Sequence, residues 1–280
     1  MDHWDPALIN PLAAVRPVLL IDNAGVGRSG GTVPKTFSGW AQHYINVISA
    51  LDIRQVDVMG FSMGGCVAQL VALNAPRGLV RRLVLCGTIP STGQGVVTAP
   101  LGPFNQLKAA VTEQQQKDAF LATFFTSSRR SQAAGEAAWA RITRARHDRS
   151  HYVPADGAHR QAVAFAKFMD PKQATEASYD RFHHLDLPVL IANGKIHEKM
   201  DGCLFSYLIA TLSTNGHATP TRKRGPPAAD REQYPHVEEA QPCSSSAAPL
   251  SRFGTWVLVP VCRPLREHRQ CLPRPDRDPP

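Results

Sequence analysis

The chain has 280 residues, of which 43% are hydrophobic, enough for the core of one α/β domain with an inserted subdomain. The formal net charge of +8 does not indicate nucleic-acid binding, because the basic residues are scattered among acidic ones and form no stripe. No run approaches the roughly 20 apolar residues of a membrane span, and the N-terminus lacks a signal-peptide pattern. The six cysteines show no paired metal spacing. We therefore expect a soluble, cytoplasmic protein without a metal site or disulfide framework.

Strand and helix patterns alternate through the first 96 residues. The apolar run Val18–Ile21 predicts a buried strand that enters a Gly-rich loop. Further strands are predicted at 56–59 and 82–86, with a helix at 64–74 between them. Helical spacing of apolar residues predicts one buried face on another helix: Trp40, Tyr44, Val47, Ile48 and Leu51. This alternation favours a parallel sheet.

The pattern changes twice after residue 96. Residues 97–184 read as an inserted helical cap, with helices expected near 106–125 and 133–146. Residues 187–192 return to strand character, so the sheet domain is predicted from 1–96 and 185–212. Residues 213–280 hold 12 of the 23 prolines among Ser, Arg and Gly. Such a composition predicts a disordered tail.

The sequence Gly60-Phe61-Ser62-Met63-Gly64 is a G-x-S-x-G motif between a predicted strand and a predicted helix. This is the context of a nucleophile elbow, in which a strained strand-to-helix turn presents the serine. Gly60 and Gly64 would let the backbone pass closely, and the Met63 N–H would donate to a developing oxyanion at the helix start. The motif alone occurs by chance often, but its placement makes an incidental serine a poor explanation.

A second motif competes with this interpretation. Gly25, Gly27 and Gly30 fit the dinucleotide pattern G-x-G-x-x-G, and Asp52 lies downstream in the expected range. An NAD-binding fingerprint should open a helix directly, whereas the next helix is predicted to begin only near Phe37. NAD binding therefore remains the weaker alternative.

Taken together, the motifs resemble the α/β-hydrolase superfamily, and in particular its serine esterase and haloperoxidase-like branch. The stretches V-L-L-I-D-N-A-G-V-G-R-S, G-F-S-M-G-G, R-R-L-V-L-C-G-T and L-P-V-L-I-A-N-G-K occur in that family's order over residues 1–212. The resemblance implies a doubly wound, mostly parallel sheet with a helical cap. It also implies Ser62 as the nucleophile, an ester or similar acyl bond of a small molecule as the substrate, and no metal or organic cofactor.

The resemblance places the triad acid after the A-N-G stretch. Counting back from Met200 selects Glu198, whereas counting forward from Asn193 selects His197 instead. Glu198 could also be an exposed loop residue whose carboxylate has no catalytic role. The acid therefore stays open, with Glu198 as the candidate.

The chain departs from the family pattern in two places. The family's early strands and oxyanion loop would precede Met1, and no late segment resembling Y-P-D-S-G-H-G-F-L-F-Q-Y carries the catalytic histidine. When residues 250–262 are back-translated and the codons are read one base later, the permitted codons can encode that segment. A retained intron over residues 213–249 that shifted the reading frame would explain this. We therefore expect an impaired hydrolase; the alternative is a non-catalytic pseudoenzyme or a mis-predicted gene product.

Overall fold

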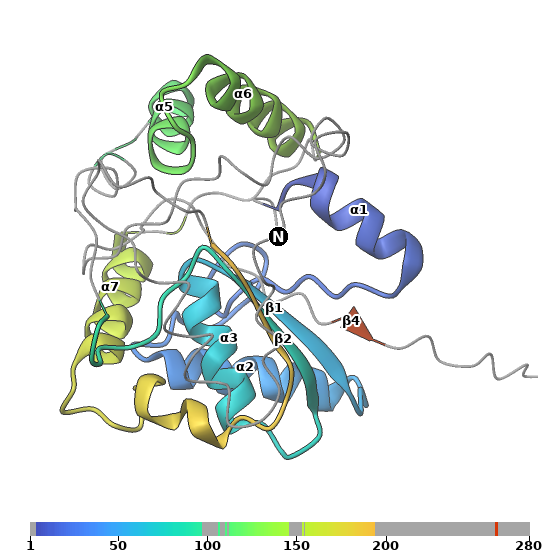
Figure 1. The fold of residues 1–280 in the computed structure, drawn as a ribbon, viewed down its shortest axis with the longest axis vertical. Coiled ribbons are helices and arrows are strands. Elements are labelled where there is room, and N and C mark those ends of the chain that lie inside the picture. The colour runs from blue at the N-terminus through green and yellow to red at the C-terminus, as the bar shows by residue number, and fades with distance from the viewer. Residues whose placement is uncertain are drawn as a thin grey trace, which may run out of the picture.

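A four-stranded sheet of order β3-β2-β1-β4 forms the centre of the protein. The computed structural model describes residues 4–96, 106, 110, 112–145, 153, 155–193 and 261–262. Strands β1 (Val56–Phe61), β2 (Val80–Cys86) and β3 (Val189–Ala192) run parallel, and β4 (Val261–Cys262) pairs antiparallel with the start of β1 (Figure 1). The predicted mostly parallel sheet of an α/β protein is confirmed.

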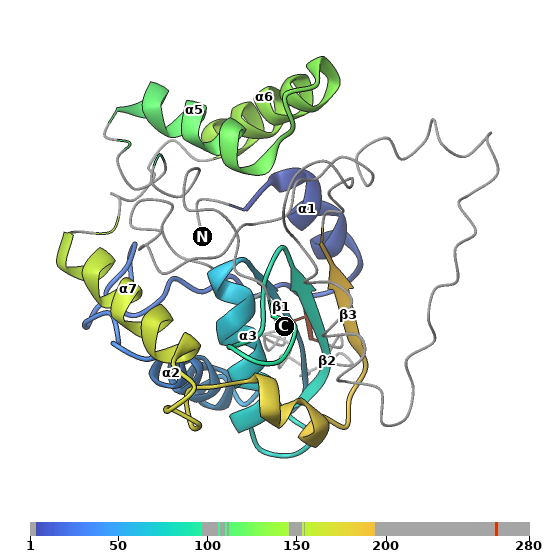
Figure 2. The same cartoon turned by 60° about the vertical axis from the view of Figure 1, so that its left-hand side comes forward.

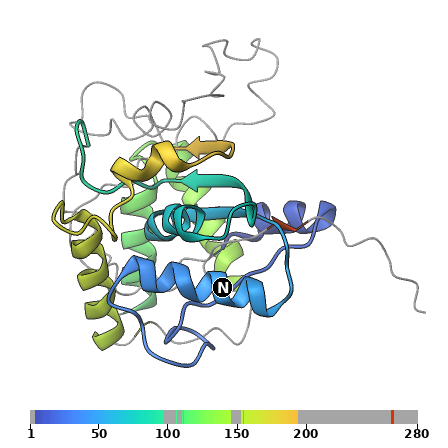
Figure 3. The same ribbon diagram turned by 90° about the horizontal axis from the view of Figure 1, so that it is seen from below.

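Two neighbouring helices pack beside this sheet. Helix α3 (Met63–Asn74) packs against β1 and β2, and helix α2 (Phe37–Ala50) packs against α3 (Figure 3). Every residue of α3 from Met63 to Val71 is buried. A helix buried all round lies in a core, so the helix that follows Ser62 is held firmly in place.

Helix α2 shows how the apolar spacing acts. Thr36 caps its N-terminus by accepting a hydrogen bond from the Gly39 N–H at 3.0 Å. The buried residues follow the three- and four-residue spacing of one helix face: Phe37, Trp40, Ala41, Tyr44, Ile45 and Ile48. Leu51 was predicted on this face, but it is 54% exposed, because the helix ends at Ala50 and Leu51 is only its C-cap.

The predicted strand at Val18–Ile21 is wrong. Only Val18 forms an isolated bridge, and residues 19–23 have no regular structure. An apolar run reports burial and does not by itself report strand pairing. Val18 and Leu20 satisfy that burial by packing on a small cluster around Ile9, which also includes Met59 of β1.

The described elements of the predicted cap, residues 97–184, are all helical. They are α5 (Glu113–Phe124), α6 (Arg129–Arg144), α7 (Ala155–Met169) and the 3₁₀ helix η1 (Tyr179–His184). Helices α5 and α6 lie together at one end of the molecule, whereas α7 lies beside α2 (Figure 2). The rings of Phe165 and Phe168 in α7 pack against Phe37 of α2. The helices of this segment therefore fall into two groups, one of them packed on the sheet domain.

Helix α1 (Pro6–Val15) connects to α6 through its N-cap. The Asp5 carboxylate accepts hydrogen bonds from the Ala7 N–H and from Nε and Nη2 of Arg141. Burial acts to raise the pKa of Asp5, but the Arg141 and Ala7 hydrogen bonds outweigh it and hold the pKa below its usual value. Across the described residues, we find no helix with the length and apolar character needed to cross a membrane.

Candidate active site

Ser62 lies at the junction between β1 and α3, where the predicted elbow belongs. Its backbone has φ of 53° and ψ of −125°, and residues other than glycine rarely adopt such a positive φ. Only one other described residue besides glycine, Asp52, has a positive φ. Such strain costs about 1–3 kcal/mol and persists only where the surroundings impose it.

Hydrogen bonds from several elements impose that conformation. The Ser62 N–H donates to the Cys86 carbonyl at the end of β2 at 2.9 Å. The Ser62 carbonyl accepts from the Gly65 N–H at 2.8 Å and from the Thr88 hydroxyl at 2.6 Å. The serine backbone is therefore clamped between the neighbouring strand, the first turn of α3 and the loop after β2.

The elbow leaves no room for a side chain at two glycines. A Cβ on Gly60 would lie 2.4 Å from the Gly64 carbonyl oxygen, and a Cβ on Gly65 would lie 2.5 Å from the Thr88 side chain. The main chain of Gly64, the second predicted elbow glycine, thus lies directly against Gly60. Gly65 is a requirement that the sequence motif does not identify, because Thr88 reaches it only in the folded protein.

Met63 is the first residue of α3 and only 4% of its surface is exposed. The N–H groups in the first turn of a helix have no acceptor within that helix and carry the positive end of its dipole. Ser62 itself is 7% exposed. A backbone donor and a hydroxyl-bearing residue are thus adjacent in a largely buried position, which suits stabilisation of an oxyanion.

Asn193 connects the end of β3 to this elbow. Its side-chain oxygen accepts from the Thr88 N–H at 3.3 Å, and its amide nitrogen donates to the Thr88 carbonyl at 3.1 Å. Since the Thr88 hydroxyl donates to the Ser62 carbonyl, one residue joins the A-N-G stretch to the nucleophile turn. The sequence assigns no role at the elbow to Thr88 or Asn193, although both lie in the quoted stretches L-C-G-T and A-N-G.

Aromatic side chains extend from the elbow toward α5 and α6. The Phe61 ring, next to Ser62, lies 5.5 Å from the Phe124 ring, and Phe120 contacts both Phe124 and Trp139 at 5.4 and 5.3 Å. These separations are typical of packed aromatic pairs. The helices beyond the carboxyl end of β1 therefore present an apolar surface near the serine.

The remaining triad candidates are not brought together in the described structure. Glu198 and His197 lie outside the described residues. The histidines within them, His43, His159, His183 and His184, are all exposed. The described part of the chain also holds no cluster of three or more His, Cys, Asp or Glu side chains that could bind a metal ion.

The glycine loop that suggested a dinucleotide folds back on itself. The Gly25 N–H donates to the Gly30 carbonyl at 2.9 Å, and α2 begins seven residues after Gly30. Thr36 and the Glu176 carboxylate already accept hydrogen bonds from the first turn of α2, at the Gly39 and Ser38 N–H groups. A pyrophosphate would meet a carboxylate there instead of open donors, so the geometry does not favour NAD.

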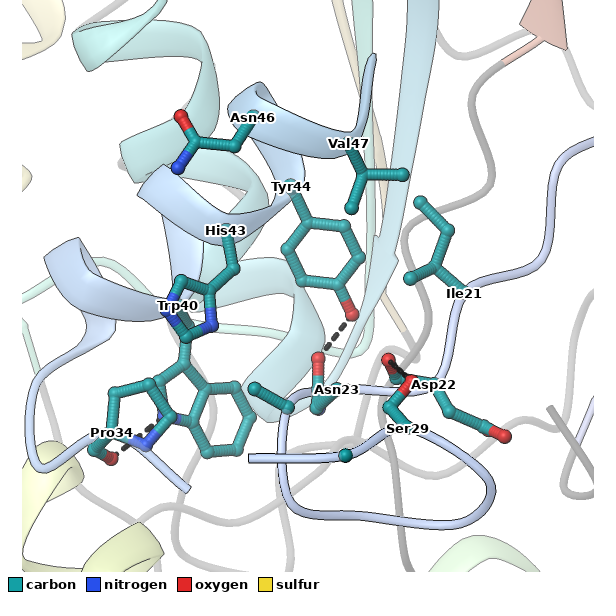
Figure 4. A pocket seen from close by; sticks show the side chains of 12 residues that line it. Ile21, Asp22, Asn23, Ser29, Pro34, Trp40, His43, Tyr44, Asn46 and Val47 are labelled. Atoms are coloured by element: carbon teal, nitrogen blue, oxygen red, sulfur yellow. Dashed lines mark hydrogen bonds between the residues drawn. The ribbon is translucent and has the colours of Figure 1, made fainter. Parts of the chain in front are cut away.

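A pocket of about 300 Å³ lies between this loop and α2 (Figure 4). Trp40 and Tyr44 form its wall, and the Tyr44 hydroxyl donates to the Asn23 side-chain oxygen. Its lining includes neither Ser62 nor Met63. The pocket is therefore separate from the strained turn at Ser62.

Comparison with known proteins agrees with this assignment of the fold. A model of the Alpha/beta hydrolase family matches residues 1–242, which extends beyond the predicted sheet-domain limit at residue 212. The α/β hydrolase fold protein from Chitinophaga pinensis aligns with a TM-score of 0.56 and 26% identity, covering 75% of this chain and 71% of that one.

Two curated proteins match shorter segments. The chain is 35% identical over 85 residues to the putative carbamate hydrolase RutD of Agrobacterium fabrum, covering 30% of this chain and 32% of that protein. It is 38% identical over 79 residues to a 2-hydroxymuconate semialdehyde hydrolase of a Pseudomonas species, covering 28% of each. The matched segments thus span about a third or less of these relatives.

Proposed function

This chain belongs to the alpha/beta hydrolase family, and we propose that Ser62 is the nucleophile of a hydrolase acting on an ester or related acyl bond of a small molecule. The carrying observation is the strained backbone of Ser62 at the β1–α3 junction, clamped by Cys86, Gly65 and Thr88. Strain of this kind concentrates at functional sites. A structural turn alone would have favoured glycine at this position.

The proposed reaction proceeds through an acyl-enzyme. In an intact form of the chain, with the histidine segment in frame, the Ser62 hydroxyl would lose its proton to that histidine as its oxygen attacks the substrate carbonyl, and the leaving group would then depart with that proton. The Met63 N–H stabilises the negative oxygen that forms during the attack. Glu198 is the proposed acid that orients the histidine. Water completes the reaction by the same route, with no metal or organic cofactor required.

The relatives support a small substrate. Their names describe hydrolysis of a carbamate and of a 2-hydroxymuconate semialdehyde, both small molecules. The aromatic side chains of Phe61, Phe120 and Phe124 next to the elbow would suit the apolar part of such a substrate.

We propose further that this chain is impaired as a catalyst. It contains no in-frame segment like the family's late histidine motif, and the described histidines are exposed whereas Ser62 is buried. Loss of one triad member typically leaves only about 10³–10⁴-fold acceleration over water. Activity at a small fraction of the family level is the expected result.

The first test combines a transcript with a labelling assay. The cDNA across the codons for residues 212–262 would show whether an intron is removed and the histidine segment enters the frame. The chain as written and the corrected chain would then be exposed to a fluorophosphonate probe. We expect strong labelling of the corrected chain, little labelling of the chain as written, and none after Ser62→Ala.

The exposed Ser49 offers a matched control, since Ser49→Ala should leave labelling unchanged. Labelling of the corrected chain that survives Ser62→Ala would refute the nucleophile assignment. Rapid labelling of the chain as written would refute the impairment. A transcript that matches the chain as written, with no labelling, would favour the non-catalytic alternative.

A further inference from the structure

Three arginines surround one buried carboxylate at the end of β1 that lies away from Ser62. Asp57 is the second residue of β1, and its side chain is 8% exposed. Arg81 of β2 binds both carboxylate oxygens, through Nε at 2.7 Å and through its terminal nitrogen. The positive charge of Arg81 in this bidentate pair already balances the single negative charge of Asp57.

Arg16 and Arg82 add two more positive charges to the same carboxylate. Their Nη1 atoms lie 3.6 and 3.7 Å from Asp57 Oδ2, beyond hydrogen-bonding distance. Among the described residues, Asp57 is the only polar partner of either guanidinium group. Within the described part of the chain, the hydrogen-bond donors of both groups are therefore unused, and the two side chains are 39% and 54% exposed.

The charge and spacing of this group fit an anion. Three guanidinium groups and one carboxylate leave a net charge of +2 by simple count. Because both Nη1 atoms approach the same oxygen, their separation cannot exceed 7.3 Å, the sum of 3.6 and 3.7 Å. A tetrahedral oxyanion that accepts hydrogen bonds of about 2.8 Å can reach both guanidinium groups at once within this limit, from the exposed side of the two arginines and not from the position that Asp57 Oδ2 occupies.

We propose that Arg16 and Arg82 form a binding site for a doubly charged tetrahedral oxyanion, inorganic phosphate or the phosphate group of a monoester. The Arg81–Asp57 pair holds the site in place, because Asp57 is buried in the sheet and orders the arginines around it. Planar guanidinium groups recognise phosphate oxygens in pairs, which a lysine cannot do.

This site is distinct from the proposed catalytic one. Ser62 follows Asp57 by five positions, and β1 carries the chain between them in extended form, which corresponds to about 16 Å. Arg16 comes from the C-cap of α1, and Arg82 from β2, so the anion would join α1 to the sheet. Binding should therefore stabilise the fold without requiring an active serine.

The test is a titration of the full chain with inorganic phosphate at pH 8, with ionic strength held constant by sodium chloride. Calorimetry gives the affinity, and the unfolding midpoint reports stabilisation by ligand. We expect Arg16→Gln and Arg82→Gln each to weaken phosphate binding about tenfold, the size of one lost charged hydrogen bond. The double variant should bind no phosphate at the concentrations used.

The control is Arg77→Gln, which removes the same charge from a side chain that is 94% exposed and paired with an equally exposed Asp186. It should bind phosphate as the unmodified chain does. Phenyl phosphate should bind like inorganic phosphate, and the singly charged dimethyl phosphate at least tenfold more weakly. The proposal is overturned if chloride alone reproduces the midpoint shift, or if the Arg77 variant loses as much affinity as the Arg82 variant. Arg82 lies on the strand surface, so its variant decides the question even if the Arg16 variant does not fold.

Discussion

Replacing Ser62 with glycine should stabilise the fold relative to replacing it with alanine. Both changes remove the hydroxyl, but alanine keeps a Cβ at φ of 53°, where glycine has none. Relief of the strain should stabilise the glycine variant by about 1–3 kcal/mol, whereas the greater freedom of glycine in the unfolded chain should destabilise it by about 0.5–1 kcal/mol. The net expectation is that Ser62→Gly is more stable than Ser62→Ala by about 1 kcal/mol.

Urea unfolding followed by tryptophan fluorescence would measure this difference, because Trp40 and Trp139 are buried at 2% and 7% exposure. In a thermal scan the same difference corresponds to about 2–4 °C for a chain of this size. Equal stability of the two variants would limit the strain at Ser62 to about 0.5–1 kcal/mol, the amount that the unfolded-state freedom of glycine offsets. Lower stability of the glycine variant would refute the reasoning outright, since only the unfolded-state cost would then remain.

Three further predictions test the packing around the elbow and the sheet. Gly65→Ala should destabilise the protein by about 1–3 kcal/mol in urea unfolding, because the new Cβ would lie 2.5 Å from the Thr88 side chain. Gly30→Ala is the control: the space around Gly30 is open, so stability should change by less than about 0.5 kcal/mol. Asp57→Asn should cost about 2 kcal/mol in the same assay, since it leaves guanidinium groups around a buried neutral amide; a neutral result would show that the pairs contribute nothing. Burial raises the pKa of the Cys86 thiol to about 11, so the unfolded chain ionises first and stability should fall by up to about 2–3 kcal/mol as the pH rises from about 9 toward 11. Stability measured across this range should fall less in Cys86→Ala, and an identical decline in both proteins would exclude the thiol as its cause.

Structural coupling of the elbow to the A-N-G stretch bears on the proposed mechanism. Asn193 holds Thr88 through two hydrogen bonds, and Thr88 in turn holds the Ser62 carbonyl. The candidate acid Glu198 follows Asn193 by only five residues in the sequence. Asn193, the last described residue before the candidate acid, is thus held by the same threonine that restrains the proposed nucleophile.

The sequence by itself determined the elements whose causes are local. Gly60, Ser62 and Met63 identify the elbow because a strand, a strained turn and a helix start are consecutive in the chain, and the structure places them at the β1–α3 junction. Apolar spacing located α2 for the same reason, since the periodicity of a helix lies within a few turns. It failed at Leu51, where the end of the helix and not the spacing decides exposure.

Only the tertiary structure decided which distant residues meet. Whether Val18 and its neighbours become a strand depends on a partner elsewhere, and they pack around Ile9 instead. Thr88 lies 26 residues from Ser62 and 105 from Asn193, and no local pattern reports those contacts. Arg16 reaches Asp57 only because α1 ends beside the start of β1. Local propensity and spacing act over a few residues, whereas close packing selects contacts by shape and charge across the whole chain.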